Sequence, residues 1–194
     1  MNWLFSYMWS GSNYIRYCIE YLTKKPTQGP VRLIEHNQEY ILYRSHYVLD
    51  TQPNSKIALL IRNPIELALR KSLIDSNSTN PIENIHSVCG RYLSFIQRYP
   101  NSHIIYYEDL LDSFDVVKNL IDFYEIPLVD SLSEFEEKLD YHKQKSYELG
   151  NLYLSDSSKM FYSKMLDKTE LKYMKSEIRN HSEELNQILS RYFT

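Results

Sequence analysis

The first residues suited to chemistry form a small polar group near the start of the chain, Ser10-Gly11-Ser12-Asn13. They follow a short apolar and aromatic run and precede a stretch whose apolar residues recur at helical spacing. Such a loop points backbone N–H groups and the positive end of the helix dipole at one place, which favours an anion such as phosphate. The alternative is an ordinary turn between strand and helix, in which Ser10, Ser12 and Asn13 act as turn or N-cap residues.

Polar residues also follow the ends of the other predicted strands. They are Arg44 to His46, Arg62 with Asn63, and residues 107–109. In open α/β sheets, ligands bind outside the carboxyl ends of the strands. We therefore expect these residues and the Ser10–Asn13 loop to contribute to one candidate site.

The elements that must position these residues alternate along the chain. Apolar runs predict strands at residues 3–7, 40–48, 56–62 and 102–107. Helical periodicity and capping signals predict helices that begin near residues 14, 64, 81, 113, 131 and 167, the last two running to about residue 147 and nearly to residue 193. This order predicts one α/β domain over residues 1–194, with a central parallel sheet of about four or five strands flanked by helices.

Two details of this pattern can be checked against the structure. If the second strand persists to residue 48, Arg44 and His46 lie on the same side of it. In the first helix, Arg16, Glu20 and Lys24 recur on a face separate from the apolar one.

Composition excludes several classes of protein. The 194 residues carry a net charge of −3, which argues against a broad nucleic-acid surface, so an anion site must rest on a local group of cations. Cys18 and Cys89 both lie in helical patterns and are expected to be buried thiols, not a disulfide or a metal site. No apolar run approaches membrane-spanning length, and a cytoplasmic protein is the expectation.

Four segments together resemble sulfotransferases that use 3′-phosphoadenosine 5′-phosphosulfate (PAPS). The resemblance covers about residues 3–127 and rests on SYMWSGSNYIRY, YRSHY, LLIRNPIELALR and YYEDLLDSFDVVKNLIDFYEIP, in that order along the chain. The first is similar to the family's 5′-phosphosulfate loop and the second to its Lys-Thr-His strand end. The third is similar to its Arg-Asn-Pro segment at the 3′-phosphate, and the fourth to the strand–helix unit that follows. The resemblance implies a fold like that of P-loop NTPases.

The resemblance also implies roles for individual residues. Trp9, Ser10, Gly11, Ser12 and Asn13 would surround the 5′-phosphosulfate of the donor. Arg62 would bind the 3′-phosphate, with Arg70 as a further contact. His46 would accept the proton of the acceptor hydroxyl, and Arg44 would stabilise charge on the transferring group. The implied donor is PAPS and the implied acceptor is a hydroxyl compound, with carbohydrates among the candidates; no metal is expected.

Three of the assigned residues have simpler alternatives. Arg62 would form a strand-end ion pair with an acid such as Glu66, and Arg70, one helical turn after Glu66, would form an i,i+4 pair with it. His46 is alternatively a hydrogen-bonded structural residue.

The sequence also departs from the family pattern. Trp9 stands where the family has Lys or Arg, Met8 where it has Pro, and Arg70 where it has a 3′-phosphate Ser. The Arg-Lys-Gly segment of many members is missing, and the nearby candidates to replace it are Ser157, Ser158, Lys159 and Lys164.

These departures leave a second function open, a catalytically impaired protein that binds a nucleotide or a glycan. A P-loop kinase is a third possibility, but the loop has no Gly-Lys-Ser/Thr, which ATP chemistry needs.

Overall fold

The computed structural model describes residues 1–29, 33–35, 39–74, 80–150, 166–180 and 182–192. The chain divides into two compact units, Met1–Leu60 with Asn101–Ser155, and Ile61–Pro100 with Asp156–Thr194. The first segment of the second unit lies between the third and fourth strands along the chain, and its other segment follows the first unit. The expectation of a single domain over residues 1–194 stays a prediction.

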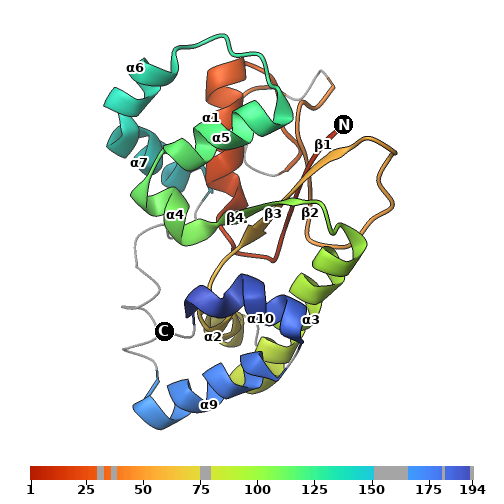
Figure 1. Cartoon of the computed structure of the whole chain (residues 1–194). Helices are drawn as coiled ribbons and strands as arrows, with labels where there is room; N and C mark the ends of the chain where they lie inside the picture. Colours follow the sequence, from red (N-terminus) through yellow and green to blue (C-terminus); the bar gives the residue numbers. More distant parts are fainter. Residues whose placement is uncertain (30–32, 36–38, 75–79, 151–165, 181, 193–194) are drawn as a thin grey trace. The chain divides into compact units, whose positions relative to one another are not determined.

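The first unit contains a four-stranded sheet with the order β2-β1-β3-β4 (Figure 1). The strands are β1 (Asn2–Ser6), β2 (Tyr43–Ser45), β3 (Lys56–Ile61) and β4 (His103–Tyr106). β1 pairs in parallel with β2, Leu4 opposite Arg44, and in parallel with β3, Leu4 opposite Ala58. The predicted α/β class with a central parallel sheet is therefore confirmed.

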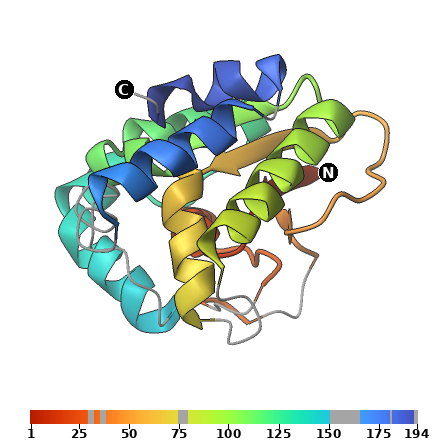
Figure 2. The same ribbon diagram turned by 90° about the horizontal axis from the view of Figure 1, so that it is seen from below.

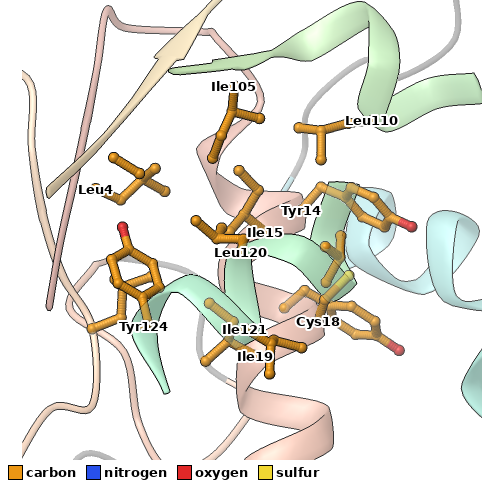
Figure 3. Packing of buried hydrophobic residues seen from close by; sticks show 14 of the residues in the cluster. Leu4, Tyr14, Ile15, Cys18, Ile19, Ile105, Leu110, Leu120, Ile121 and Tyr124 are labelled. Carbon is orange, nitrogen blue, oxygen red and sulfur yellow. The ribbon is translucent and has the colours of Figure 1, made fainter. Parts of the chain in front are cut away.

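Helices of the first unit cover one face of this sheet. They are α1 (Ser12–Thr23), α4 (Tyr107–Asp112), α5 (Asp115–Tyr124), α6 (Leu132–Glu137) and α7 (Leu139–Gly150). Figure 3 shows Leu4 and Ile105 from the sheet packed with Ile15 of α1 and Leu120 of α5. Burial of this apolar cluster stabilises the unit by about 25 cal/mol for each Å² removed from water. It also holds the start of α1 against the end of β1.

The described residues of the second unit lie mainly in helices. Its helices are α2 (Pro64–Ile74), α3 (Pro81–Arg98), α9 (Lys168–Arg179) and α10 (Glu183–Leu189), followed by the 3₁₀ turn η1 (Ser190–Tyr192). α3 packs against α2, α9 and α10, and Figure 2 shows α2 and α3 side by side.

The structure corrects two helix predictions. The helix expected over residues 131–147 is broken at Lys138, whose N–H bonds to the carbonyl of Phe135 in a tight terminal turn. The helix expected from residue 167 has the predicted capping box at Asp167 and Glu170, but α9 ends at Arg179. Ser182 then caps α10 through a 3.1 Å bond from the N–H of Leu185, a competing start signal inside the predicted helix.

Candidate functional site

The predicted anion loop lies between β1 and α1 and has an unusual backbone. Trp9 has φ 64° and Gly11 has φ 89°, both in the left-handed region. Gly11 is the N-cap of α1 and makes no side-chain cap hydrogen bond, so the prediction that Ser10, Ser12 or Asn13 caps the helix is wrong. The first amides of α1 are thus not satisfied by a capping side chain, and the left-handed Gly11 before helical Ser12 gives successive N–H groups the geometry of an anion nest.

Gly11 is required at its position for two reasons. Its φ of 89° is strained for residues with a side chain. A Cβ atom built on Gly11 would also lie 2.3 Å from Cε2 of Tyr107, at the start of α4. Tyr107 is buried, so the ring that follows β4 determines how closely the loop approaches the sheet.

Ser10 supplies a hydroxyl in this loop. The residue is 1% exposed, and its Oγ atom has no hydrogen-bond partner within the described ranges. Its N–H bonds to the carbonyl of Tyr7 at 3.3 Å, which holds the turn closed. A buried hydroxyl without a partner is uncommon in proteins, and beside the first amides of α1 it suits a ligand oxygen.

Arg44 lies on β2 and reaches the start of α1. Its Nη1 atom is 3.3 Å from Ser12 Oγ and 3.3 Å from Asn13 Oδ1. Burial lowers the pKa of its guanidinium from the ordinary value, but arginine stays charged at neutral pH. The structure therefore places a cation next to the predicted phosphosulfate loop.

His46 is positioned by β1. Its Nδ1 atom is 2.9 Å from the carbonyl oxygen of Ser6, the last residue of that strand, and 3.3 Å from Ser6 Oγ. A carbonyl can only accept, so Nδ1 carries the proton that it donates, and Nε2 is the basic nitrogen of the neutral ring. This is the tautomer that a general base needs.

The predicted strand over residues 40–48 is shorter than expected. β2 ends at Ser45, whose hydroxyl donates to the carbonyl of Tyr47 at 2.8 Å and accepts from its N–H at 3.0 Å. This local turn competes with the sheet for the backbone groups. His46 therefore lies beyond the strand and does not share a strand face with Arg44.

In the second unit, Arg62 and Arg70 converge on Glu66. Arg62 Nη2 contacts Glu66 Oε1, and Arg70 Nε and Nη2 each lie 2.8 Å from the same oxygen. Glu66 is fully buried. The ion pairs considered as an alternative are thus present, yet two guanidiniums share one carboxylate.

The Arg62 backbone is fixed as well. The hydroxyl of Tyr92 accepts from the N–H of Arg62 and donates to its carbonyl, at 3.0 Å each. Asn63 begins α2, with Oδ1 3.0 Å from the N–H of Ile65. The 3′-phosphate role of Arg62 and Arg70 stays a prediction.

One buried charged group was not predicted by the sequence patterns. Arg16 and Glu20, expected on a polar helix face with Lys24, are both fully buried, whereas the Lys24 side chain is 48% exposed and paired with Asp130. Helical spacing does not distinguish an exposed charged face from one covered by a distant segment, here Thr27 and its neighbours.

The remaining site predictions concern the substitutes for the family's Arg-Lys-Gly segment and the expected absence of a metal, and both stay predictions. Ser157, Ser158, Lys159 and Lys164 lie outside the described residues. Within the described part of the chain, no cluster of His, Cys, Asp and Glu has the arrangement of a metal site. Nor does any described helix have the length and apolar character needed to cross a membrane.

The sheet and its flanking helices define a sulfotransferase-like α/β fold. Among solved structures, the chain is similar to mouse sulfotransferase SULT7A1 complexed with PAP, with a TM-score of 0.54 and 15% sequence identity over 100% of this chain and 82% of that one. No protein-family model matches the sequence, and no curated protein matches it. The likeness therefore concerns the fold, and function must be argued from the residues.

Proposed function

We propose that this protein is a PAPS-dependent sulfotransferase that moves a sulfuryl group to a hydroxyl, with carbohydrates among the candidate acceptors. The observation that carries the proposal is the occurrence of a guanidinium on β2 and an imidazole just after β2, both held by contacts near the β1–α1 loop. Arg44 contacts Ser12 and Asn13 at the start of α1, and His46 is held by the carbonyl of Ser6. Either residue alone has an ordinary structural explanation. A cation at the start of α1 together with an imidazole at the end of β1 suits group transfer.

The residues present have the right chemistry for a phosphosulfate. The amides around Gly11, the hydroxyl of Ser10 and the guanidinium of Arg44 are all donors. A sulfuryl or phosphoryl oxygen accepts from such groups, and the helix dipole adds to the attraction. We assign Arg62 and Arg70 to the 3′-phosphate on the sequence motif, and the convergence of both guanidiniums on Glu66 Oε1 supports that assignment.

The chemistry that we propose needs one base and one electrostatic stabiliser. His46 Nε2 accepts the proton of the acceptor hydroxyl, whose oxygen forms a bond to sulfur as the bond from sulfur to the 5′-phosphate oxygen breaks. The products are a sulfate ester and adenosine 3′,5′-bisphosphate. Arg44 and the loop amides stabilise negative charge that builds on the departing oxygen.

A second candidate is a binding protein with the same fold and little activity. Trp9 favours it, because an indole supplies one N–H donor and no charge where the family loop has a cation. Trp9 also adopts φ 64°, a conformation with an energetic cost for a bulky side chain. In this case the anion loop binds a nucleotide or a glycan sulfate, and no sulfuryl group is transferred.

Calorimetry and a transfer assay distinguish these functions. The full chain is titrated with adenosine 3′,5′-bisphosphate and, in parallel, with ATP. It is then incubated with radiolabelled PAPS and a panel of glycan and phenol acceptors. Bisphosphate binding with transfer supports the enzyme, and bisphosphate binding without transfer supports the binding protein. Preference for ATP over the bisphosphate contradicts both.

A further inference from the structure

A buried charged cluster lies directly behind the anion loop in the first unit. It consists of Asn13, Arg16, Glu20, Thr27 and Arg44. Arg16 is fully buried, and its Nη1 atom donates to Asn13 Oδ1 at 3.1 Å. Arg44 Nη1 approaches the same oxygen at 3.3 Å. One amide oxygen therefore links two guanidiniums.

The segment over residues 26–29 closes this cluster from outside. Thr27 Oγ1 accepts from Arg16 Nε at 2.9 Å and donates to Glu20 Oε1 at 2.6 Å. Thr27 also forms a parallel bridge with Leu42, just before β2. Gly29 has φ 147°, and a Cβ atom there would lie 2.3 Å from Arg16 Nη1, so this segment packs directly on the guanidinium.

This cluster brings two guanidiniums and one carboxylate together. Arg16 and Arg44 both approach Asn13 Oδ1, and Glu20 is the carboxylate beside Arg16. Arg16 Nη2 lies 3.7 Å from Glu20 Oε1, an oxygen that also accepts from the Thr27 N–H at 2.9 Å. The pKa of Arg16 is lowered to about 10, first by burial and then by the charge of Arg44, although Glu20 opposes the shift. An anion bound at the start of α1 would therefore favour the charged form of both guanidiniums.

We propose that Arg16 is a positioning residue of the anion site, which holds Asn13 and Arg44 at the start of α1 and supplies buried positive charge for a phosphate or sulfate group. This inference rests on the proposed function, because it concerns the same loop. It assigns to Arg16 a role that neither the sequence motifs nor the fold comparison gives it. The chemical class of the ligand is a multiply charged oxyanion.

A merely structural Arg16 has different consequences. If it only anchors residues 26–29, its removal lowers stability but leaves the anion affinity of the folded protein unchanged. Neutralising Glu20 then also lowers stability without raising affinity. If Arg16 and Glu20 instead set the charge at the loop, neutralising them changes anion affinity in opposite directions.

The test compares Arg16→Gln, Arg16→Lys, Glu20→Gln and the control Lys24→Gln in the full chain. Lys24 lies just past the end of the same helix, is half exposed and pairs with Asp130, so its variant removes an equal charge away from the loop. Affinities for adenosine 3′,5′-bisphosphate and for inorganic pyrophosphate are measured by calorimetry, at a temperature where circular dichroism shows each variant folded.

We expect about ten-fold weaker binding of both probes by Arg16→Gln, partial recovery in Arg16→Lys, and several-fold tighter binding by Glu20→Gln. Lys24→Gln should stay within about two-fold of the native protein because exposed charges are screened. If Arg16→Gln does not fold, Arg16→Lys and Glu20→Gln still give the opposite signs.

Changes of the same sign in the Arg16 and Glu20 variants, or native affinity in Arg16→Gln, overturn the positioning role. If the native protein binds pyrophosphate but not adenosine 3′,5′-bisphosphate, PAPS is not its donor, and the Arg16 test then relies on pyrophosphate alone. If the native chain binds neither probe, both proposals are wrong.

Discussion

His46 Nδ1 lies 2.9 Å from the carbonyl oxygen of Ser6, across 40 positions of the chain. This contact fixes the ring tautomer and ties the residue after β2 to the end of β1. A serine side chain is not needed for the main contact, because the acceptor is a backbone oxygen. The contact therefore orients the ring of His46, the base in our proposal, through the end of a sheet strand.

His46→Ala is expected to remove turnover while bisphosphate affinity stays within about two-fold of the native value. Loss of a general base typically slows a reaction by about 10²- to 10⁴-fold. Single-turnover transfer from radiolabelled PAPS measures the rate, and calorimetry measures the affinity. Ser6→Ala is the matched control, since it keeps the carbonyl contact and should retain most activity. Full turnover in folded His46→Ala would rule out the base.

Gly11→Ala is expected to destabilise the protein by about 1–3 kcal/mol and to weaken anion binding. The left-handed backbone disfavours a side chain, and the new methyl group meets the Tyr107 ring. Gly90→Ala is the control, because a Cβ at this α3 position meets nothing within 4 Å. It should raise stability by about 0.5–1 kcal/mol. Urea unfolding of both variants measures the difference, and equal effects would contradict the argument.

Trp9→Lys is expected to raise the rate of sulfuryl transfer with little change in bisphosphate affinity. A cation at this position stabilises the departing oxygen more in the transition state than in the ground state, an effect of up to about 10²–10³-fold. Trp9→Gln is the comparison, because it removes the indole without adding charge. A fast native enzyme that both substitutions slow would show instead that Trp9 itself contributes to catalysis.

Arg70→Ala is expected to narrow the preference for adenosine 3′,5′-bisphosphate over AMP, since one charge-assisted contact contributes about 1.5–3 kcal/mol. Arg62→Ala should narrow it further. Arg62→Ala should also cost stability, because removing a partner of a buried carboxylate costs about 3–5 kcal/mol. Pairing Arg62→Ala with Glu66→Gln should restore part of the stability but not the preference. Equal melting shifts with both nucleotides in the native protein would contradict the assignment.

His142 gives the protein an expected pH dependence of stability. Its ring stacks on Phe135 with centroids 3.8 Å apart, and Tyr17 Oη lies 2.9 Å from its Nδ1. The pKa of His142 is lowered, first by burial and then by the charges of Lys138 and Lys24. The unfolded chain therefore binds a proton to this histidine more readily than the folded chain does. The contribution of neutral His142 to the free energy of unfolding is complete above the ordinary pKa of histidine. That contribution is lost as the pH falls through the lowered pKa of the folded protein.

His142→Phe is the variant that tests this dependence. Its unfolding free energy, measured in urea between pH 7.5 and pH 5, should fall less steeply with acid than that of the native protein. Parallel pH profiles for the two proteins would show that His142 is not responsible.

The sequence by itself determined the features that depend on local pattern. Apolar runs and helical periodicity fixed the α/β order, because burial alternates with the period of each element. In the capping box, Asp167 and Glu170 are three residues apart, and Glu66 lies four residues from each of its two arginine partners. Sequence spacing was therefore sufficient to predict both sets of contacts. The small polar loop after β1 could also be recognised, since few residues other than glycine tolerate the backbone at Gly11.

Tertiary structure decided the features that depend on distant contacts. The tautomer of His46, for example, followed from a carbonyl on another strand. Arg16 and Glu20 became buried because Thr27 supplies polar partners to both, a result that helix periodicity does not contain. Burial of a charge is favourable only where a folded chain brings hydrogen-bond partners to it, and those partners lie outside the helix that carries the charge.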